Sequence, residues 1–439
     1  MKETPLGKYL YVPHGFQLES FYPILEIDES VEQLLALCDG THTREEILTL
    51  LSSETGEPIQ EFEADFDAFV EYMMGEHVLE WSQVPDPVQP LHKRNSPFSM
   101  SFDITYACNL SCPFCSVDAG EPRPDELTVE DIAPFLEWIK TVKPSPVMIN
   151  GGEPLMRKDF LLHILQELSQ VKDIITPVLT NGTLITREYA RDLVEAGLTI
   201  GRVGIDGHTA ALHNAMRGEG TFKKAIAGIE NLKECGIHVN VIAVITQLNY
   251  PHLQDIVAFL ETIADSYNIA PVYPFGRATS DMMLTQEQVF RVKTAHLKGG
   301  KIETLIAPRT QCDAGDVIHI AGNGDIFPCF YMQFPEYRLG NIKEDFSSIY
   351  DAHVMRTVLE LDVDKIEECR TCEIRYFCGG GCRGFARHMC GSVLSPDPLD
   401  CESNKILVDQ IQKTGEDVTK KVLEELLDRT RHLKTGAWR

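Results

Sequence analysis

Ten of the thirteen cysteines in this chain fall into two blocks whose spacing suggests metal chemistry. The first block consists of Cys108, Cys112 and Cys115 and reads C-x3-C-x2-C. Three thiolates at this spacing bind three irons of a 4Fe–4S cube and leave the fourth iron open to a ligand that is not protein. A small molecule at that iron would receive an electron directly from the cluster. We therefore predict these cysteines to be the catalytic and metal-binding residues.

Two other uses of clustered cysteines fit this block less well. A zinc site needs a fourth Cys or His, and none follows within the next few residues. A disulfide framework needs an oxidising compartment, but the chain begins MKETPLGKYL, without the pattern of a signal peptide. The sequence also lacks an apolar run of about 18 residues. We expect a cytoplasmic protein whose clustered cysteines hold iron and sulfur.

The segment TYACNLSCPFCS closely resembles the cluster loop of radical S-adenosylmethionine (SAM) enzymes. The resemblance implies that SAM chelates the open iron through its amino and carboxylate groups. One electron then cleaves SAM to a 5′-deoxyadenosyl radical, which abstracts a hydrogen atom from the substrate. It also implies a reductant such as flavodoxin or ferredoxin. Phe114 matches the family's aromatic residue near the adenine.

Further motifs of that family follow predicted strands. Glycines let a backbone approach a ligand closely, and a carboxylate offers an acceptor. The GGEP segment would thus contact the SAM amino group through Gly151, Gly152, Glu153 and Pro154. Weaker matches assign SAM contacts to Asn181 of a TNG turn, Asp206, Arg217 and Arg277. Arg217 could instead form a surface salt bridge. Gly204 stands where the family often has Ser, so one polar contact to SAM would be absent or supplied elsewhere.

The second block resembles the SPASM domain, which carries two auxiliary iron–sulfur clusters. Its spacing is C-x11-G-x4-C, then C-x2-C-x5-C-x3-C, and finally Cys401. Four thiolates can also bind zinc, so the identity of the metal is inferred from the resemblance. Carried over residue by residue, the outer cluster would be held by Cys369, Cys372, Cys378 and Cys401, and the inner one by Cys312, Cys329 and Cys382. The inner cluster's fourth ligand would be a substrate group or Cys390.

Strands alternating with helices predict an α/β fold with a parallel sheet. We expect strands at 101–105, 146–150, 176–180, 200–205, 239–246 and 270–275, with a helix opening at Thr128 and helical stretches at 160–171 and 222–236. Six such units fit the partial (β/α)6 TIM-type barrel of radical SAM enzymes. Catalytic groups would then lie at the carboxyl ends of the strands.

Residues 1–82 are expected to form an α+β winged-helix domain. Strands are predicted at 9–12 and 24–27, a capping box joins Thr43 to Glu46, and a second apolar helix would contain Phe62 to Met73. This order resembles the recognition elements that bind leader peptides of ribosomally made precursors by adding a strand to a sheet edge. A generic winged helix or a structural cap is the alternative.

The expected domains follow from these patterns. The winged helix (1–82) is followed by a proline-rich linker (83–98), the partial barrel (99–305), the SPASM domain (306–405) and a helical tail (406–439). The formal net charge of −26 disfavours nucleic acid and anionic membranes as partners. Residues 1–80 hold 18 acidic and 3 basic residues. This acidity is either a solvated surface or an attraction for a basic partner.

These resemblances predict an oxidoreductase that matures a precursor peptide with a leader segment, by a thioether or carbon–carbon crosslink. Phe330 occupies the position of the Asp base of sulfatase-maturing relatives, which disfavours formylglycine formation. The stretch at 379–384 and the Asp397-Pro398 pair also resemble SPASM enzymes acting on tetrapyrroles in alternative haem routes. A non-enzymatic iron–sulfur electron carrier is the remaining alternative.

Overall fold

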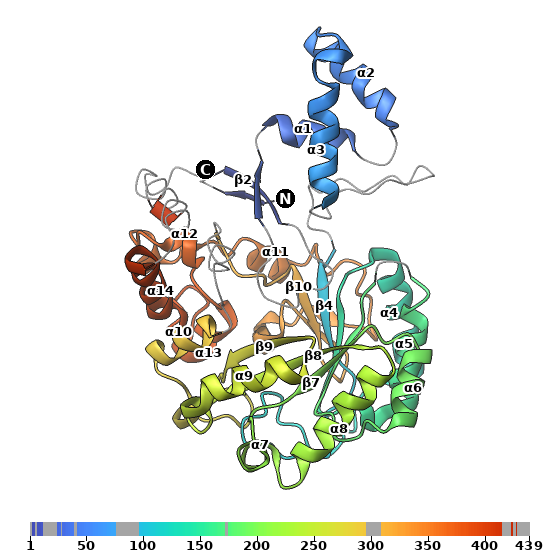
Figure 1. Cartoon of the computed structure of the whole chain (residues 1–439), viewed down its shortest axis with the longest axis vertical. Helices are drawn as coiled ribbons and strands as arrows, with labels where there is room; N and C mark the ends of the chain where they lie inside the picture. The colour runs from blue at the N-terminus through green and yellow to red at the C-terminus, as the bar shows by residue number, and fades with distance from the viewer. Residues whose placement is uncertain are drawn as a thin grey trace.

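A computed structural model describes most of the chain. The described residues are 2–4, 7–11, 24–27, 29–38, 42–75, 96–171, 174–295, 309–414, 423–424 and 427. Figure 1 shows a barrel-like body built on a curved sheet, with helices α1 to α3 standing beyond one end of it. Most of the predicted linker and most of the predicted tail lie outside the described residues.

The body is organised around a sheet of nine strands in the order β12-β11-β10-β4-β5-β6-β7-β8-β9. Six consecutive strands are parallel neighbours, which confirms the predicted α/β architecture. Their bounds are β4 Ser99–Asp103, β5 Val147–Asn150, β6 Pro177–Thr180, β7 Ile200–Gly204, β8 His238–Ile245 and β9 Ser266–Pro271.

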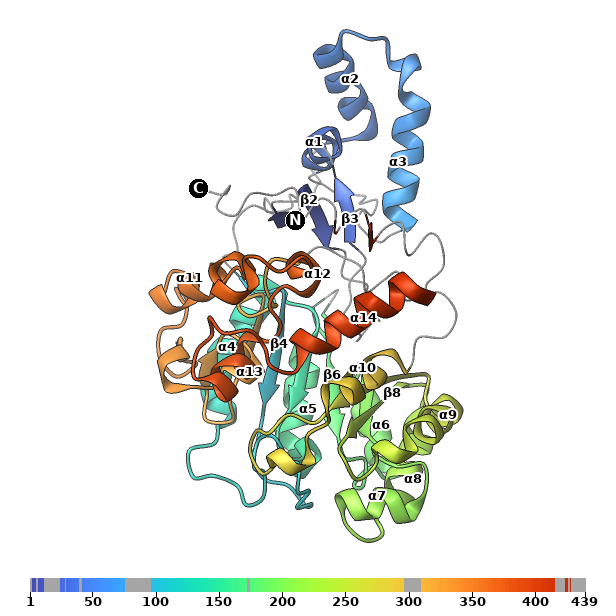
Figure 2. The same ribbon diagram turned by 90° about the vertical axis from the view of Figure 1, so that its left-hand side faces the viewer.

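Helices connect these strands and cover the outer face of the sheet (Figure 2). The helix predicted to open at Thr128 begins there, because the Thr128 hydroxyl accepts from Asp131 N while the Asp131 carboxylate accepts from Thr128 N. Apolar residues of the helices and strands form one core. The helices are α4 Val129–Val142, α5 Lys158–Leu168, α6 Arg187–Glu195, α7 Ala210–Arg217, α8 Thr221–Glu234, α9 Leu253–Ile263 and α10 Gln286–Thr294.

Two features of the sheet differ from the prediction. The sixth strand begins at Ser266 rather than at residue 270, and residues after Pro271 form a loop. A proline cannot donate to the next ladder bond, so Pro271 and Pro274 end the strand early. In addition, β10 (Val317–Ile320) pairs in parallel with β4, and β11 (Asp325–Phe327) and β12 (Gly340–Asn341) continue the sheet antiparallel. The first part of the predicted SPASM domain therefore extends the barrel sheet.

The N-terminal part has the predicted α+β composition. An antiparallel sheet of β1 (Lys2–Thr4), β2 (Gly7–Tyr11) and β3 (Ile24–Ile27) precedes α1 (Glu29–Leu37), α2 (Arg44–Thr55) and α3 (Glu63–Gly75). The capping box of Thr43 and Glu46 opens α2, as predicted. Strand β1 and helix α1 were not predicted.

Short helices and loops make up the rest of the C-terminal part. Its helices are α11 His353–Leu359, α12 Arg375–Cys378, α13 Arg383–Cys390 and α14 Asp400–Thr414. Helix α14 runs through the predicted boundary at 405/406, carries Cys401, and is joined to α10 by an ion pair of 2.7 Å between Lys293 Nζ and Asp400 Oδ1. None of the described helices combines the length and the apolar character needed to cross a membrane.

Candidate active site

The first cysteine block lies in the loop that leaves the carboxyl end of β4. Cys108 N donates to Gly120 O at 2.8 Å, which closes the loop on itself. The amides of Leu110 and Ala119 each point at a sulfur, Cys108 Sγ and Cys115 Sγ, at 3.4 Å. Amides directed at sulfur stabilise thiolate ligands, so this arrangement suits the binding of a cluster.

The protonation of these thiols fits metal binding. Burial raises the pKa of Cys112 to about 11, and the neighbouring charges of Asp206, Cys108 and Cys115 add to the rise. Burial also raises the pKa of Cys108. A bound cation is what allows such buried thiols to ionise at neutral pH.

The spacing of the sulfurs argues against a single zinc ion. Thiolates around one tetrahedral zinc would lie about 3.8 Å apart. Within the part of the chain that the structure describes, only His208, His252 and Asp255 form a group whose three ligand atoms all lie within 4.8 Å of one another. No three of the described cysteines therefore place their sulfurs as close together as a single tetrahedral zinc would.

The GGEP segment follows β5 and lies directly against the cluster loop. Gly152 N donates to Thr105 O and Glu153 N donates to Ala107 O, both at 2.7 Å. A Cβ added at Gly152 would lie 2.3 Å from Ala107 O, so only glycine permits this approach. Pro154 begins the short helix that follows.

The Glu153 carboxylate is buried and held by its own chain. It accepts from Leu155 N at 3.1 Å, Thr180 Oγ1 at 2.7 Å and Asn181 N at 2.7 Å. Burial raises its pKa, while these three bonds oppose the rise. Glu153 thus ties the carboxyl ends of β5 and β6 together beside the cluster loop.

Asn181, at the carboxyl end of β6, links that strand to the cluster loop. Its Nδ2 donates to Asn109 Oδ1 at 2.9 Å, and Asn109 lies between the first two cysteines. Its Oδ1 accepts from Thr183 N. The predicted site residues of β5 and β6 therefore lie together at the cluster loop.

Asp206 and Arg217 form a buried ion pair of 2.5 Å between Asp206 Oδ2 and Arg217 Nε. The other carboxylate oxygen of Asp206 accepts from Val244 N at 2.8 Å. Because its carboxylate is occupied in this way, Asp206 positions Arg217. Burial lowers the pKa of Arg217, but the nearby negative charges of Asp206 and Cys112 outweigh this effect and raise it. The guanidinium thus interacts electrostatically with a cysteine of the cluster loop.

The position of Arg217 explains why residue 204 is glycine, where the family often has serine. A Cβ added to Gly204 would lie 2.3 Å from Arg217 Nη2 and 2.6 Å from its Cζ. The guanidinium therefore fills the space of the serine side chain. Arg217 also lies over the Phe114 ring, with 5.6 Å from Cζ to the ring centroid. Phe114 packs with Met216 and is buried.

Arg277 contacts the cluster loop rather than an open surface. Its Nε donates to Cys112 O at 3.0 Å, and its backbone N donates to Cys115 O at 2.9 Å. Its Nη1 pairs with Asp118 Oδ1 at 2.9 Å. Arg277 thus clamps the loop that presents the three cysteines.

The electrostatic contacts of the second block divide its cysteines into two groups. Burial raises the pKa of Cys329, and the charges of Cys382 and Cys312 add to it. Burial raises the pKa of Cys369 to about 11, with contributions from three other cysteines of the second group, namely Cys378, Cys372 and Cys401. None of these seven cysteines is in a disulfide.

Cys390 is separated from the inner group by a helix. Cys382 is the N-cap of α13 and Cys390 is its last residue, which puts them about 12 Å apart along the axis. The Cys390 side chain is exposed. The helix therefore disfavours Cys390 as a fourth ligand of a cluster bound by Cys382.

A buried arginine that was not predicted as a site residue lies between the two groups. Arg383 is 2% exposed, and its positive charge lowers the pKa of both Cys312 and Cys369 against the effect of burial. Its guanidinium donates to carbonyl oxygens of Gly380, Gly381, Val393 and Ser395. Among the described residues, no carboxylate lies within 4.0 Å of it.

A second unpredicted group lies inside the barrel. Ser101 Oγ is 3.0 Å from His319 Nδ1, and His319 Nε2 is 3.6 Å from Asp103 Oδ2. All three side chains are buried. Ser101 and His319 are 218 residues apart in sequence, so only the pairing of β4 with β10 reveals the contact.

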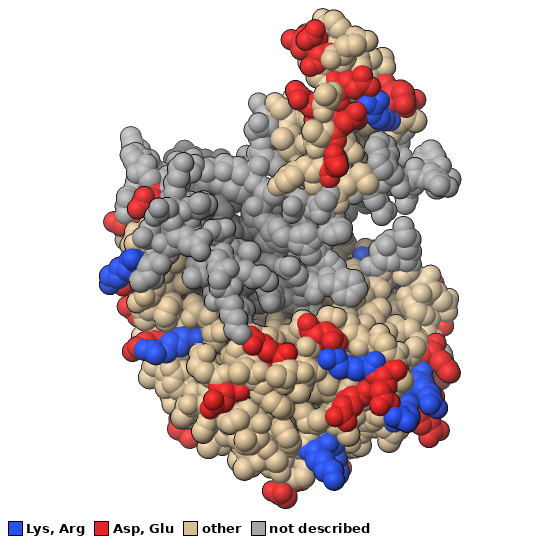
Figure 3. All heavy atoms as spheres, viewed as in Figure 1, with Lys and Arg blue, Asp and Glu red and all other residues tan. Residues whose placement is uncertain are grey.

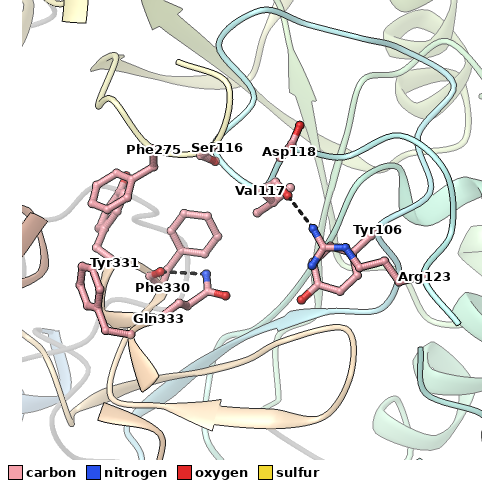
Figure 4. Close-up of a pocket in the computed structure, with 11 residues that line it drawn as sticks. Tyr106, Ser116, Val117, Asp118, Arg123, Phe275, Phe330, Tyr331 and Gln333 are labelled. Atoms are coloured by element: carbon pink, nitrogen blue, oxygen red, sulfur yellow. Dashed lines mark hydrogen bonds between the residues drawn. The ribbon is translucent and has the colours of Figure 1, made fainter. Parts of the chain in front are cut away.

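A cavity of about 220 Å³ opens beside the cluster loop and is lined by residues that the sequence did not single out as ligands (Figure 4). Its walls come from the loop after Cys115, the loop after β9 and the segment after Cys329. The aromatic run at 330–334 was the available signal, but its partners lie far away in sequence.

Comparisons with known proteins agree with this geometry. The radical SAM superfamily model matches residues 102–260, and the iron–sulfur cluster-binding SPASM model matches residues 312–373. Mycofactocin maturase of Mycolicibacterium smegmatis is 26% identical, covering 69% of this chain and 82% of its own. AdoMet-dependent heme synthase of Oleidesulfovibrio alaskensis is 29% identical, covering 68% and 86%.

A solved structure shows the same fold. Streptococcus suis SuiB bound to precursor peptide SuiA has a TM-score of 0.63 and 18% identity, over 87% of this chain and 94% of that one. The cofactors of this chain are SAM and iron–sulfur clusters. The chain is a radical SAM enzyme that carries a SPASM iron–sulfur cluster-binding domain.

Proposed function

We propose that this enzyme modifies a ribosomally made precursor peptide and forms a thioether or carbon–carbon crosslink in it. The observation that supports this most is the combination of an N-terminal strand-and-helix domain with the two cysteine regions on one chain. Relatives named mycofactocin maturase and PqqA peptide cyclase, and a fold neighbour bound to a precursor peptide, agree with it. The N-terminal domain would bind the leader, and the cavity would receive the residue to be modified. We place the enzyme in the cytoplasm, where thiols stay reduced, and expect flavodoxin or ferredoxin to reduce it.

The ligand assignments are part of the proposal. Cys108, Cys112 and Cys115 would hold the SAM-binding cluster. Cys369, Cys372, Cys378 and Cys401 would hold the outer auxiliary cluster, and Cys312, Cys329 and Cys382 the inner one. When bound, SAM and its cluster supply hydrogen-atom abstraction.

The chain's own residues would orient SAM. The backbone of the GGEP segment would face the SAM amino group, with the buried Glu153 carboxylate fixing that segment to β6. Arg217 would face the SAM carboxylate, and Phe114 the adenine. Asn181 and Arg277 would act by fixing the cluster loop, and Asp206 by holding Arg217. Their contacts in the structure support these roles.

A tetrapyrrole substrate is the second candidate, because a heme synthase is among the relatives at 29% identity. The N-terminal domain favours the peptide. The non-enzymatic carrier is set aside because the chain is a radical SAM enzyme.

The test uses the full-length, cluster-loaded chain under anaerobic conditions. It is first used to capture small peptides from the native lysate, and each captured peptide is then incubated with SAM and reductant. A crosslink appears in mass spectrometry as the loss of two hydrogen atoms, together with 5′-deoxyadenosine. The Cys112→Ala variant is the control and should form neither product. If no captured peptide changes mass while a porphyrin precursor is converted, the peptide proposal is wrong.

A further inference from the structure

The cavity beside the cluster loop has one wall of aromatic rings. Phe275 and Tyr331 have ring centroids 5.3 Å apart, and Phe330 meets Tyr331 edge-on at 5.2 Å. All three rings line the cavity, Phe275 from the loop after β9 and Phe330 and Tyr331 from the segment after Cys329 (Figure 4). Such a wall binds a flat, conjugated group by stacking or edge contacts.

The facing wall carries a cation without a carboxylate partner. Arg123 lines the cavity, and Nη2 donates its one hydrogen bond within the described structure, to Val117 O at 3.4 Å. Among the described residues, no carboxylate oxygen lies within 4.0 Å of its guanidinium. The nearby Asp118 is paired with Arg277.

Glu126, three residues further along the chain, is occupied by other donors. Glu126 accepts from the backbone amides of Tyr106 and Arg123 at 2.7 and 3.0 Å, and from Thr105 Oγ1 at 2.8 Å. Most N–H groups of Arg123 therefore remain unused, in a chain whose net charge is −26. Arg123 is exposed, so these N–H groups are open to an anion that enters the cavity from solvent.

Arg123 is also held in place before any ligand arrives. Its Cζ lies 3.6 Å from the centroid of the buried Tyr106 ring. Pro122 and Pro124 flank it and restrict the backbone. A guanidinium stacked by its face keeps its N–H edge available, and that edge fits a carboxylate with two parallel bonds.

We propose that this cavity binds a substrate group that joins a flat ring to a carboxylate, with the ring against Phe275, Phe330 and Tyr331 and the carboxylate on Arg123. The inference rests on the proposed function, because the cavity is taken to be where the substrate is modified. A peptide supplies this chemistry through an aromatic residue with a nearby acidic side chain or C-terminus. A tetrapyrrole supplies it through its own carboxylates.

The test compares small probes that differ only in the charge. N-acetyltyrosine and N-acetyltyrosinamide share the ring, but only the first has a carboxylate. Their binding to the cluster-loaded, full-length chain is measured anaerobically by saturation-transfer NMR, and coproporphyrin is measured by its fluorescence. The variants are Arg123→Gln, Arg123→Lys and the control Arg291→Gln, whose side chain is 60% exposed on α10 and lies outside the cavity. Iron content shows that each variant has folded.

We expect the acid to bind about tenfold more tightly than the amide, as one charge-assisted pair provides. The preference should disappear in Arg123→Gln, persist partly in Arg123→Lys and be unchanged in Arg291→Gln. If acid and amide bind equally, or the preference survives in Arg123→Gln, the inference is wrong. If only coproporphyrin shows binding that depends on Arg123, the carboxylate site stands and the peptide function falls.

Discussion

At the scale of single residues, Gly204 decides where Arg217 lies. A serine there would place its Cβ 2.3 Å from Arg217 Nη2, and the ion pair with Asp206 restricts the arginine's escape. We expect Gly204→Ser to displace the guanidinium and weaken SAM binding about tenfold or more, the effect of one lost charge-assisted pair. Equilibrium dialysis with labelled SAM on the cluster-loaded enzyme measures this. The control is Gly120→Ser, because a Cβ at Gly120 would lie in open space. Gly218→Ser is unsuitable, because the φ of +112° at Gly218 favours glycine. Unchanged SAM affinity in Gly204→Ser would refute the role of Arg217.

Asp103 gives a second prediction at this scale. Both of its carboxylate oxygens are buried without a hydrogen-bond partner, and burial raises its pKa to about 7. The folded state therefore holds a proton that the unfolded chain releases near pH 4. Stability from this group is present below that pH and is lost as the pH rises towards 7. We therefore compare the melting temperatures of Asp103→Asn and the parent protein. The variant's melting temperature minus the parent's should be larger at about pH 8 than at about pH 6. A difference between the two proteins that is the same at both pH values would contradict it.

At the scale of elements, α13 presents a buried charge to both auxiliary cysteine groups. Arg383 has no carboxylate within 4.0 Å among the described residues, and an unpaired buried cation is costly unless an anion is near. Anionic clusters would provide that partner. We expect Arg383→Gln to lower the auxiliary clusters' reduction potentials by roughly 50–100 mV, since a unit charge at this range is worth about 2 kcal/mol. Titration followed by electron paramagnetic resonance reports the potentials.

The same helix offers a matched control for that experiment. Arg387 is also on α13, but it is paired with Glu336 at 2.7 Å and is partly exposed. Arg387→Gln should leave the potentials unchanged. Equal shifts in both variants would mean that the effect comes from the helix and not from the buried charge.

The elements show how far the sequence predicts this molecule. Five of the six barrel strands were located closely because each is a short apolar run between turn residues. The two cysteine blocks were recognisable from their spacing, and the division of the second block came from the resemblance to the SPASM domain. In contrast, the pairing of β10 with β4, and with it the contact of Ser101 with His319, depends on tertiary packing. The place of Arg217 above Gly204, and of Arg123 opposite an aromatic wall, depends on loops that no periodic pattern describes.

At the scale of the whole molecule, acidic charge gathers on the N-terminal helices. Figure 3 shows acidic side chains over α2 and α3, where Arg44 is already paired with Glu63 and Asp67. If this domain binds a leader, that leader should be basic and its binding should weaken with added salt, because exposed charges are screened within about 10 Å at 0.1 M salt. Replacing the exposed acids Glu54, Glu57, Asp65 and Glu71 by amides should make the salt dependence shallower. Fluorescence anisotropy with a labelled captured peptide measures both. Binding that stays constant from low to high salt would show that the acidity is only a solvated surface.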